Sequence, residues 1–557
     1  NTVFGLGILP YDDLYDVLDQ LLISKYITFS QLEGIGIYIA YVLNDFTSDY
    51  NPAHKGDFDV TYSTEKVEVP VTRENYRLPT MVSVTMGEDS STDANISWYS
   101  KSTLGGDIEI YKADSEPAFI GEGTENAPFG IDINTETVTR SFPGIDIGIG
   151  GILQYEFKIN RHIVNLTGLE SGATYYYRVG DAERDWWSET GTITTADGGK
   201  EVTFFHMADP QSQNEKQYNR AWAKVVDTAF NTLPDADFII NTGDLVDHGD
   251  NNKLWQYMFD CGAESLMNTY LMPVSGNHEG YGTNATANYF VLPGMPEQDT
   301  STGGYYSFDY NNVHIAVLNT EALSEDESLS EEQIEWLKKD MKESDADWKF
   351  VAFHKAIYSH GSHYKDDDVV ALREQLSKLM PELGIDLVFQ GHDHVYMRTG
   401  SIINNVKIPY EKSYLEKDGS IYRTQVTPCG TTYIISGCSG VKTYLQNDIS
   451  ATDKYFPRAE KALGLETPMF SAIQIEDGVL YFDAYTVTEE GATVVDRFAI
   501  QKDTEQGNVV EDYEEAEEII NKEEVEAFFN NFFEYFVKVF TIAFNLFKIY
   551  ILRVDLR

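Results

Sequence analysis

One stretch of this 557-residue chain, Phe238-Ile239-Ile240-Asn241-Thr242-Gly243-Asp244, runs from an apolar, strand-like segment into a Gly-Asp pair. Four other apolar segments lead in the same way into polar residues that can bind a metal. These residues are Asp209-Pro210-Gln211, Gly276-Asn277-His278-Glu279, His354 and Gly391-His392-Asp393-His394. Strands that end in this way bring their polar residues to one rim of a sheet, where open α/β folds place their active sites. The pattern therefore predicts an α/β fold with a metal site at that rim.

The residues between these motifs alternate between helix and strand patterns. Apolar residues within Gln213–Asn231 recur at helical spacing, and Ser330 with Gln333 forms a capping box that begins another helix. Strand, helix and loop recur in turn, which predicts a layered α/β sandwich. We expect residues 401–427 to form an insertion beside the site. Three later strands are expected to complete the second sheet, at 432–437, 472–475 and 480–485.

The residue types suit two metal ions that act on a phosphate ester. Such a reaction needs positive charge near the phosphoryl oxygens and a hydroxide near neutral pH, which two metals about 3.5–4 Å apart provide. Asp244 can give one carboxylate oxygen to each metal, and Asn277 offers a neutral amide oxygen. Imidazole nitrogens suit zinc, iron or manganese, and His354 offers one. His392 and His394 alternate in an extended segment, so both lie on one side and one can serve each metal.

The order of these motifs resembles that of the calcineurin-like metallophosphoesterases, and within them the purple acid phosphatases, over roughly residues 200–500. The resemblance implies that a first metal is bound by Asp209, Asp244 and His394. It implies that a second metal is bound by Asp244, Asn277, His354 and His392. The expected cofactor is therefore a pair of metal ions chosen from iron, zinc and manganese, with the choice left open.

The same resemblance implies roles for residues that contact the substrate. His278 is expected to contact the phosphate and to assist the leaving group, and Asn277 to share in substrate binding. His363 occupies the position of a second substrate-contacting histidine, and His360 is the competing candidate. Together with Asp244, the histidines His278 and His363 form the expected catalytic set.

Two positions depart from the relatives that the motifs resemble. The purple enzymes have a tyrosine three residues after the bridging aspartate, where this chain has Asp247, so we expect a protein without the purple colour. Other members of the wider family have a histidine two residues after the first aspartate, where this chain has Gln211. Gln211 is therefore a weak candidate ligand of the first metal, and we expect that metal to be loosely held or its coordination to be completed by water. Both departures leave the identity of the metals open.

An all-β domain is predicted upstream of the metal motifs. Short alternating runs within 78–197 are separated by Gly-, Asp- and Ser-rich turns, which is typical of a β-sandwich. The stretch Ser171–Asp181, followed by Trp187-Ser188, is similar to the fibronectin III-like N-terminal domain of purple acid phosphatases. The predicted organisation has four parts: a helical extension over 1–76, this sandwich over 77–197, the metallophosphoesterase domain over 198–502, and an acidic linker with an amphipathic helix over 503–557.

Composition limits the partners and the location. The formal net charge of −49 argues against nucleic acid or an anionic membrane surface as an electrostatic partner. Metals would instead attract a phosphorylated small-molecule or surface substrate. An acidic, lysine-poor composition together with the resemblance favours an extracellular or cell-surface location. Three cysteines are too few for a disulfide framework, and Cys429 and Cys438 either bridge two adjacent strands or stay free.

The C-terminal segment carries a further interpretation. Within 527–552, polar residues recur at steps of three and four in an otherwise apolar sequence, which places them on one helical face. This pattern argues against a helix that spans a membrane. It favours a helix that either lies on a membrane surface or docks on the apolar N-terminal stretch. We expect self-docking, with peripheral membrane contact as the alternative.

The sequence thus predicts a hydrolase that cleaves phosphate esters with hydroxide bound to a binuclear metal centre. A phosphodiesterase or nucleotidase would share every motif and is the nearest alternative. A catalytically weak cell-surface binding protein is the alternative from a different class. The complete ligand set, with Asn277 and His392 both present, argues against a binding-only protein.

Overall fold

A computed structural model gives the fold for residues 79–101, 105–119, 128–146, 152–281, 304–449, 453, 458–464, 466–502 and 508–509. The predicted N-terminal extension over 1–76 lies outside the described residues, as does the linker and helix over 503–557 apart from 508–509. No helix of the described residues is both long enough and apolar enough to cross a membrane.

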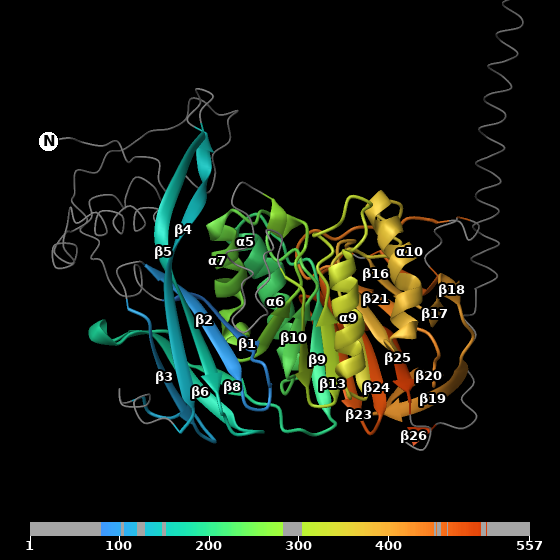
Figure 1. The fold of residues 1–557 in the computed structure, drawn as a ribbon, viewed down its shortest axis with the longest axis horizontal. Helices are drawn as coiled ribbons and strands as arrows, with labels where there is room; N and C mark the ends of the chain where they lie inside the picture. The colour runs from blue at the N-terminus through green and yellow to red at the C-terminus, as the bar shows by residue number, and fades with distance from the viewer. Residues whose placement is uncertain are drawn as a thin grey trace, which may run out of the picture. The chain divides into compact units, whose positions relative to one another are not determined.

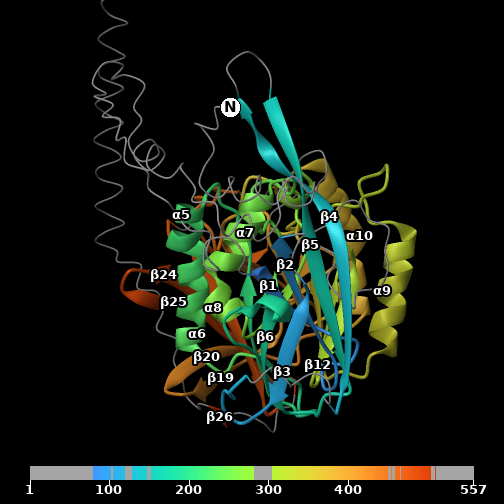
Figure 2. The same cartoon turned by 90° about the vertical axis from the view of Figure 1, so that its left-hand side faces the viewer.

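The first region is a sandwich of two β-sheets that share an apolar core. One sheet contains β1 (Thr80–Met86), β2 (Ala94–Lys101), β4 (Gly130–Asp146) and β5 (Ile152–Thr167). The other contains β3 (Asp107–Lys112), β6 (Thr174–Asp181), β7 (Trp186–Trp187) and β8 (Gly191–Thr194). Figure 2 views this region with β3 and β6 toward the reader. Alternate residues point inward, since Tyr175, Tyr177 and Val179 of β6 are buried between the sheets. The predicted β-sandwich is confirmed.

The second region contains two larger sheets that pack face to face through aromatic side chains. The first sheet runs in the order β19, β20, β25, β24, β23, β9, β10 and β11, and the second in the order β12, β13, β14, β15, β21, β16 and β22. Phe204 of the first sheet contacts Phe350 and Phe389 of the second, with ring centroids 6.0 and 5.8 Å apart. Bounds in the first sheet are β9 (Val202–Met207), β10 (Phe238–Asn241), β11 (Tyr270–Pro273), β19 (Glu411–Lys417), β20 (Ser420–Val426), β23 (Met469–Glu476), β24 (Val479–Thr488) and β25 (Gly491–Gln501). Bounds in the second are β12 (Tyr306–Tyr310), β13 (Val313–Val317), β14 (Trp348–Ala352), β15 (Leu387–Gln390), β16 (Tyr396–Thr399), β21 (Thr432–Ser436) and β22 (Ala459–Leu463).

Helices cover the two outer faces of this pair of sheets (Figure 1). On the first sheet lie α5 (Glu215–Tyr218), a π-helical turn (Asn219–Ala223), α6 (Lys224–Thr232), α7 (Asn252–Cys261) and α8 (Ala263–Leu266). On the second lie α9 (Glu331–Glu343) and α10 (Asp367–Glu382). Each group packs buried apolar side chains on its sheet, such as Trp222 on the first side and Leu337 on the second. The predicted layered α/β sandwich is therefore confirmed.

The β-sandwich and the α/β region share one continuous sheet. Strand β1 pairs in parallel with β11 at Val84 and Tyr270, so the order β9, β10, β11 continues into β1, β2, β5 and β4. The backbone N–H of Met81 also donates to Oδ1 of Asp260 in α7 at 2.9 Å. The predicted domain boundaries stay predictions. The one near residue 197 separates strands that belong to the same sheet, because β1 before it pairs with β11 after it.

Two later parts of the chain differ from the expectation. The predicted strands 472–475 and 480–485 do not complete the second sheet, because β23 pairs antiparallel with β9 and carries β24 into the first sheet. Only the predicted strand 432–437 joins the second sheet, as β21. The expected insertion over 401–427 adds β19 and β20 to the edge of the first sheet, after a small hairpin of β17 (Ile402–Ile403) and β18 (Val406–Lys407). All three cysteines are free, with Cys429 exposed and Cys438 buried.

A buried histidine in the second sheet links stability to pH. His314 lies between Asp309 and Asp340, with nitrogen-to-oxygen distances of 2.9 and 2.8 Å. Burial acts to lower the pKa of His314, but the hydrogen bonds to the two carboxylates raise it from 6.5 to about 9. Because the folded-state pKa exceeds the unfolded one, this stabilisation is complete below the unfolded pKa and is lost as the pH rises through about 9.

We expect the free energy of unfolding to fall by about 2 kcal/mol between pH 6 and pH 9.5 through this group, allowing for the exposure of Asp309. Urea unfolding of the parent protein and of a His314→Gln variant at both pH values measures the effect. The variant lacks the titrating group, so it should lose less stability over this interval. Equal losses in the two proteins would show that His314 does not carry the effect.

Candidate metal centre

The polar residues of the five motifs meet at the carboxyl ends of the central strands. Strands β9, β10 and β11 are mutually parallel, as are β14 and β15, so the loops that follow them converge. Two groups of side chains could each bind a metal ion, because the ligand atoms within each group lie within 4.8 Å of one another. Both groups contain Asp244. The first group is Asp209, Asp244 and His394, and the second is Asp244, His354 and His392. The structure thus brings together the predicted aspartate and histidine ligands of both metals, with Asp244 in both groups.

Three of these residues have a left-handed backbone. The φ angles are 52° at Asp209, 53° at Asp244 and 70° at His392. This conformation costs an L-residue about 1–2 kcal/mol, and such residues cluster at functional sites. Each of these residues lies in the loop that follows a buried strand, namely β9, β10 or β15. A left-handed backbone at three candidate ligands is a feature that functional sites share.

Two glycines make the close approach of the loops possible. A Cβ atom on Gly243 would lie 2.6 Å from Nδ1 of His354, and one on Gly276 would lie 2.3 Å from Oδ1 of Asp244. Gly243 also has a φ of 98°, which favours glycine. The Gly-Asp and Gly-Asn-His motifs therefore need glycine because no side chain fits between the loops.

The pKa values of the two carboxylates shift in opposite directions. Both are almost completely buried, at 0% exposure for Asp209 and 2% for Asp244. Burial raises the pKa of Asp209 well above its usual range, although the His354 imidazole opposes it. For Asp244 burial also acts to raise the pKa, but the imidazoles of His354, His278 and His392 lower it below its usual value. Two buried carboxylates this close repel each other, and positive charge between them offsets the repulsion.

The donor chemistry fits a pair of metal ions. Oδ2 of Asp209 and Oε1 of Gln211 are buried and have no hydrogen-bond partner, whereas buried polar atoms are normally paired. Burial lowers the pKa of His394 to about 4, which leaves a neutral imidazole as a metal requires. Nδ1 of His354 donates to the carbonyl oxygen of Thr242 at 2.7 Å, so Nε2 faces the carboxylates. Carboxylate, amide and imidazole donors of this kind suit first-row transition metals.

Asn277 and Gln211 both reach the centre through their amides. Oδ1 of Asn277 lies 3.1 Å from Nε2 of His354, and its Nδ2 donates to the hydroxyl of Tyr281 at 2.9 Å. Nε2 of Gln211 lies 3.2 Å from Oδ2 of Asp244 and 3.5 Å from Nε2 of His394. The oxygen and nitrogen of a glutamine amide exchange places by a simple rotation of the group. Gln211 therefore lies within reach of the first metal position.

His278 stands at the edge of the centre on a short 3₁₀ turn (His278–Gly280). Its Nδ1 donates to the carbonyl oxygen of Asp247 at 2.8 Å, and its Nε2 lies 3.9 Å from Oδ2 of Asp244. The side chain is 20% exposed, so Nε2 can reach a molecule bound from solvent. Asp247, where the purple enzymes have tyrosine, forms an ion pair with Lys442.

Of the two competing histidines, His363 lies nearer to the ligands. Its ring centroid is 4.3 Å from that of His392, and its Nδ1 lies 2.7 Å from Oδ2 of Asp366. The His363 side chain is 40% exposed. His360 instead contacts the carbonyl oxygen of Asn447 at 3.2 Å. The geometry favours His363, although its role stays a prediction.

Sequence reasoning gave no role to Glu279 or Lys442. The buried carboxylate of Glu279 accepts backbone N–H groups of Gly276 at 2.8 Å and Asp244 at 2.9 Å, and so ties the two metal-binding loops together. Burial and the Asp244 charge raise its pKa to about 8. Lys442 accepts Nδ1–H of His394 on its carbonyl oxygen and pairs with Asp247 through its ammonium group. A role for Glu279 could have been predicted from the sequence, because Glu279 directly follows His278 in the motif. No motif in the sequence includes Lys442.

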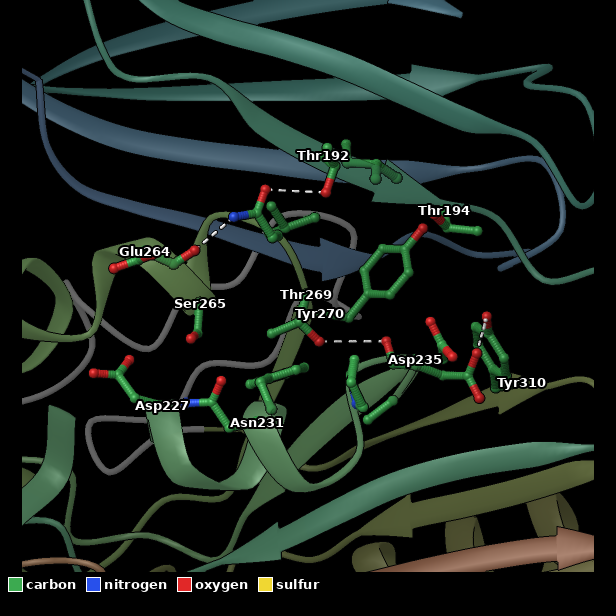
Figure 3. Close-up of a pocket in the computed structure, with 17 residues that line it drawn as sticks. Thr192, Thr194, Asp227, Asn231, Asp235, Glu264, Ser265, Thr269, Tyr270 and Tyr310 are labelled. Atoms are coloured by element: carbon green, nitrogen blue, oxygen red, sulfur yellow. Dashed lines mark hydrogen bonds between the residues drawn. The ribbon is translucent and has the colours of Figure 1, made fainter. Parts of the chain in front are cut away.

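A separate cavity of about 680 Å³ lies away from this centre (Figure 3). Its lining comes from β8, α6, α8 and the residues that lead into β10 and β11, opposite the metal-binding loops. Four carboxylates line it, and no Lys, Arg or His does; they are Asp227, Asp235, Asp237 and Glu264. This lining repels a phosphate, so the rim that carries the motifs is the better candidate site.

Comparison with known proteins agrees with this geometry. Residues 202–396 match the calcineurin-like phosphoesterase family, and residues 79–195 match the purple acid phosphatase N-terminal domain. The chain therefore contains a calcineurin-like metallophosphoesterase domain. It carries the N-terminal domain of the purple acid phosphatases and is a homologue of those proteins. The family implies a binuclear metal centre.

Individual relatives are distant. The chain is 25% identical over 321 residues to purple acid phosphatase 15 of Arabidopsis thaliana, covering 52% of this chain and 55% of that protein. It is 26% identical over 321 residues to acid phosphatase type 7 of Mus musculus, covering 53% and 67%. A purple acid phosphatase from yellow lupin (Lupinus luteus) seeds has the same fold, with a TM-score of 0.57, 17% identity, and coverage of 77% and 75%. The chain spans 55% and 64% of the length of two curated relatives it matches.

Proposed function

We propose that this protein hydrolyses phosphate esters at the centre formed by the five motif loops. The observation that carries the proposal is the presence of two groups of donor residues that share Asp244. Within each group, the ligand atoms lie within 4.8 Å of one another. Asp209, Asp244 and His394, with Gln211 beside them, would hold one metal ion; Asp244, Asn277, His354 and His392 would hold the other. Bound metals would neutralise charge on the phosphoryl oxygens and lower the pKa of a water molecule to near neutrality.

The histidines at the edge of the centre would handle the substrate. His278 keeps Nδ1–H on the Asp247 carbonyl oxygen, so its Nε2 can carry the proton that the leaving alcohol takes up. His363, oriented by Asp366, would hold a phosphoryl oxygen on the side of His392. Asn277 is fixed by Tyr281 and would serve both a metal and the substrate.

The test is a panel of phosphomonoesters and phosphodiesters, assayed alongside metal analysis of the purified protein. Turnover of at least one ester with about two metals per chain supports the proposal. A preference for diesters would favour the phosphodiesterase or nucleotidase alternative. Two bound metals without turnover of any ester would contradict the proposed hydrolase activity and favour a binding protein.

Gln211 offers a direct test of the first metal position. In Gln211→His an imidazole replaces the weak amide, 3.2 Å from the bridging carboxylate in the parent, so a chelator should remove metal roughly tenfold more slowly. The measurement is the rate of metal release into a coloured chelator. Gln213→His, on an exposed residue of the same loop, is the matched control and should leave the rate unchanged. Faster or unchanged release from Gln211→His would mean that the side chain at 211 does not serve the metal.

The location and the C-terminal segment are further proposals. An extracellular or cell-surface site is supported by the acidic composition with its formal charge of −49. For residues 527–552 we keep self-docking as the favoured proposal and peripheral membrane contact as the alternative, and the one-sided polar pattern supports both. Flotation of the full chain with liposomes, compared with a chain that ends at Lys522, tests this contact. Equal flotation of both would contradict it.

A further inference from the structure

Exposed apolar side chains gather at the edge of the candidate centre. Six large apolar side chains of the described residues are well exposed, and three of them lie beside the metal-binding loops. These three are Tyr281 at 43%, Tyr444 at 46% and Leu445 at 72% exposure. Exposed apolar groups are ordinary when scattered singly, so the contacts that Tyr281 and Tyr444 make with the centre decide whether they matter.

Both tyrosine rings lie against residues of the centre. The Tyr281 ring centroid is 4.6 Å from that of His278, and its hydroxyl accepts a hydrogen bond from Asn277 at 2.9 Å. The Tyr444 ring stacks on His394 with centroids 4.6 Å apart and planes 8° apart. Each ring therefore has one part packed on the centre and another part open to solvent.

The loop that carries Tyr444 is held at several points. Its backbone N–H donates to the carbonyl oxygen of His394 at 3.1 Å. Lys442 of the same loop pairs with Asp247, which accepts from His278. The tyrosine of this loop and Tyr281 are thus tied to one connected set of side chains. A surface that is already ordered loses little entropy when a ligand binds.

Three lysines in the described parts of the neighbouring loops are paired. Lys442 pairs with Asp247, Lys355 lies 2.6 Å from a carboxylate oxygen of Asp368, and Lys365 lies 3.0 Å from one of Asp453. A second phosphate or carboxylate on the substrate would compete with Asp247, Asp368 or Asp453 for these lysines. Among the described residues, the edge of the centre therefore suits a substrate whose organic group is uncharged.

We propose that the organic group of the phosphoester is a neutral, planar, aromatic one that lies against Tyr281 and Tyr444. This rests on the proposed function, since it names the substrate class of that same site. Aromatic rings attract one another in stacked and edge-to-face arrangements beyond what burial alone provides. A non-planar group of equal size would touch the same rings over less area.

The experiment compares benzyl phosphate with cyclohexylmethyl phosphate. Both are monoesters of a primary alcohol with a six-membered ring, so they differ chiefly in planarity and aromaticity. We expect kcat/KM to be roughly 3- to 10-fold higher for the benzyl ester, the range that one or two aromatic contacts supply. Tyr444→Leu should bring this ratio close to one, whereas Tyr444→Phe should keep it.

Two further variants serve as controls. Tyr281→Phe keeps the ring but loses the hydroxyl that holds Asn277, so it should keep the preference even if the rate falls. Val406→Ala removes an apolar side chain that is 55% exposed on β18, outside the site, and should change neither rate nor ratio. An unchanged ratio in Tyr444→Leu would overturn the role of that ring.

The outcomes separate the substrate class from the hydrolase itself. Equal kcat/KM for the two esters, with turnover intact, overturns the aromatic preference and leaves the proposed function standing. If neither ester is cleaved, calorimetry with benzylphosphonate and cyclohexylmethylphosphonate tests the surface alone. Tighter binding of the benzyl compound, lost in Tyr444→Leu, supports the contact, and equal binding overturns it.

Discussion

Replacing Asp244 with asparagine is expected to remove the bound metals and to abolish phosphoester hydrolysis while the chain stays folded. Asp244 belongs to both donor groups, and its carboxylate also accepts from the His278 backbone N–H at 2.9 Å. The amide keeps the size but loses the negative charge that offsets two cations. Metal content should fall from about two per chain toward zero, and kcat/KM by roughly 10³-fold or more.

Elemental analysis, an ester assay and circular dichroism on the same preparation check this result. Asp235→Asn is the matched control, because it removes an exposed carboxylate that lines the distant cavity of Figure 3. That variant should keep both metals and full turnover. Two retained metals with normal turnover in Asp244→Asn would refute the shared-carboxylate centre.

The strands that carry the motifs could be predicted because their signal is local. A short apolar run that ends in a ligand residue is visible in the sequence itself, and β9, β10, β11, β14 and β15 all lie where such runs occur. The helix cap at Ser330 was also visible, since its side chain accepts the N–H of Gln333 at 3.2 Å. The capping box itself is incomplete, because the Gln333 side chain binds the backbone of Asn319.

The choice of sheet for the later strands could not be predicted from local pattern. The apolar alternation of 472–475 and 480–485 specifies a strand but not its neighbour. The neighbour is decided by the free edge of β9, to which β23 pairs at Ser471 and His206. That edge exists only once the first sheet has formed.

Side-chain partners around the centre depend on contacts between distant parts of the chain. Asp247 and Lys442 are 195 residues apart, and nothing in either segment indicates the pair. The exposure of Tyr281 and Tyr444 is likewise a property of the folded chain. Motifs therefore predicted which residues can bind metal, whereas the surface that would contact the organic group of a substrate needed the structure.

Replacing His278 with alanine should keep both metals and lower the rate by roughly 10²–10⁴-fold, the range for removing a general acid or base. His278 is absent from both donor groups, and its Nε2 lies 3.9 Å from the shared carboxylate. The loss should shrink for esters whose leaving group needs no proton, such as 4-nitrophenyl phosphate, because a general acid contributes least there. His248→Ala is the matched control, since that exposed histidine lies near Tyr281 but in neither donor group, and its rate should stay near that of the parent. Loss of metal in His278→Ala, or an equal loss of rate for every leaving group, would show that His278 positions the centre and does not donate the proton.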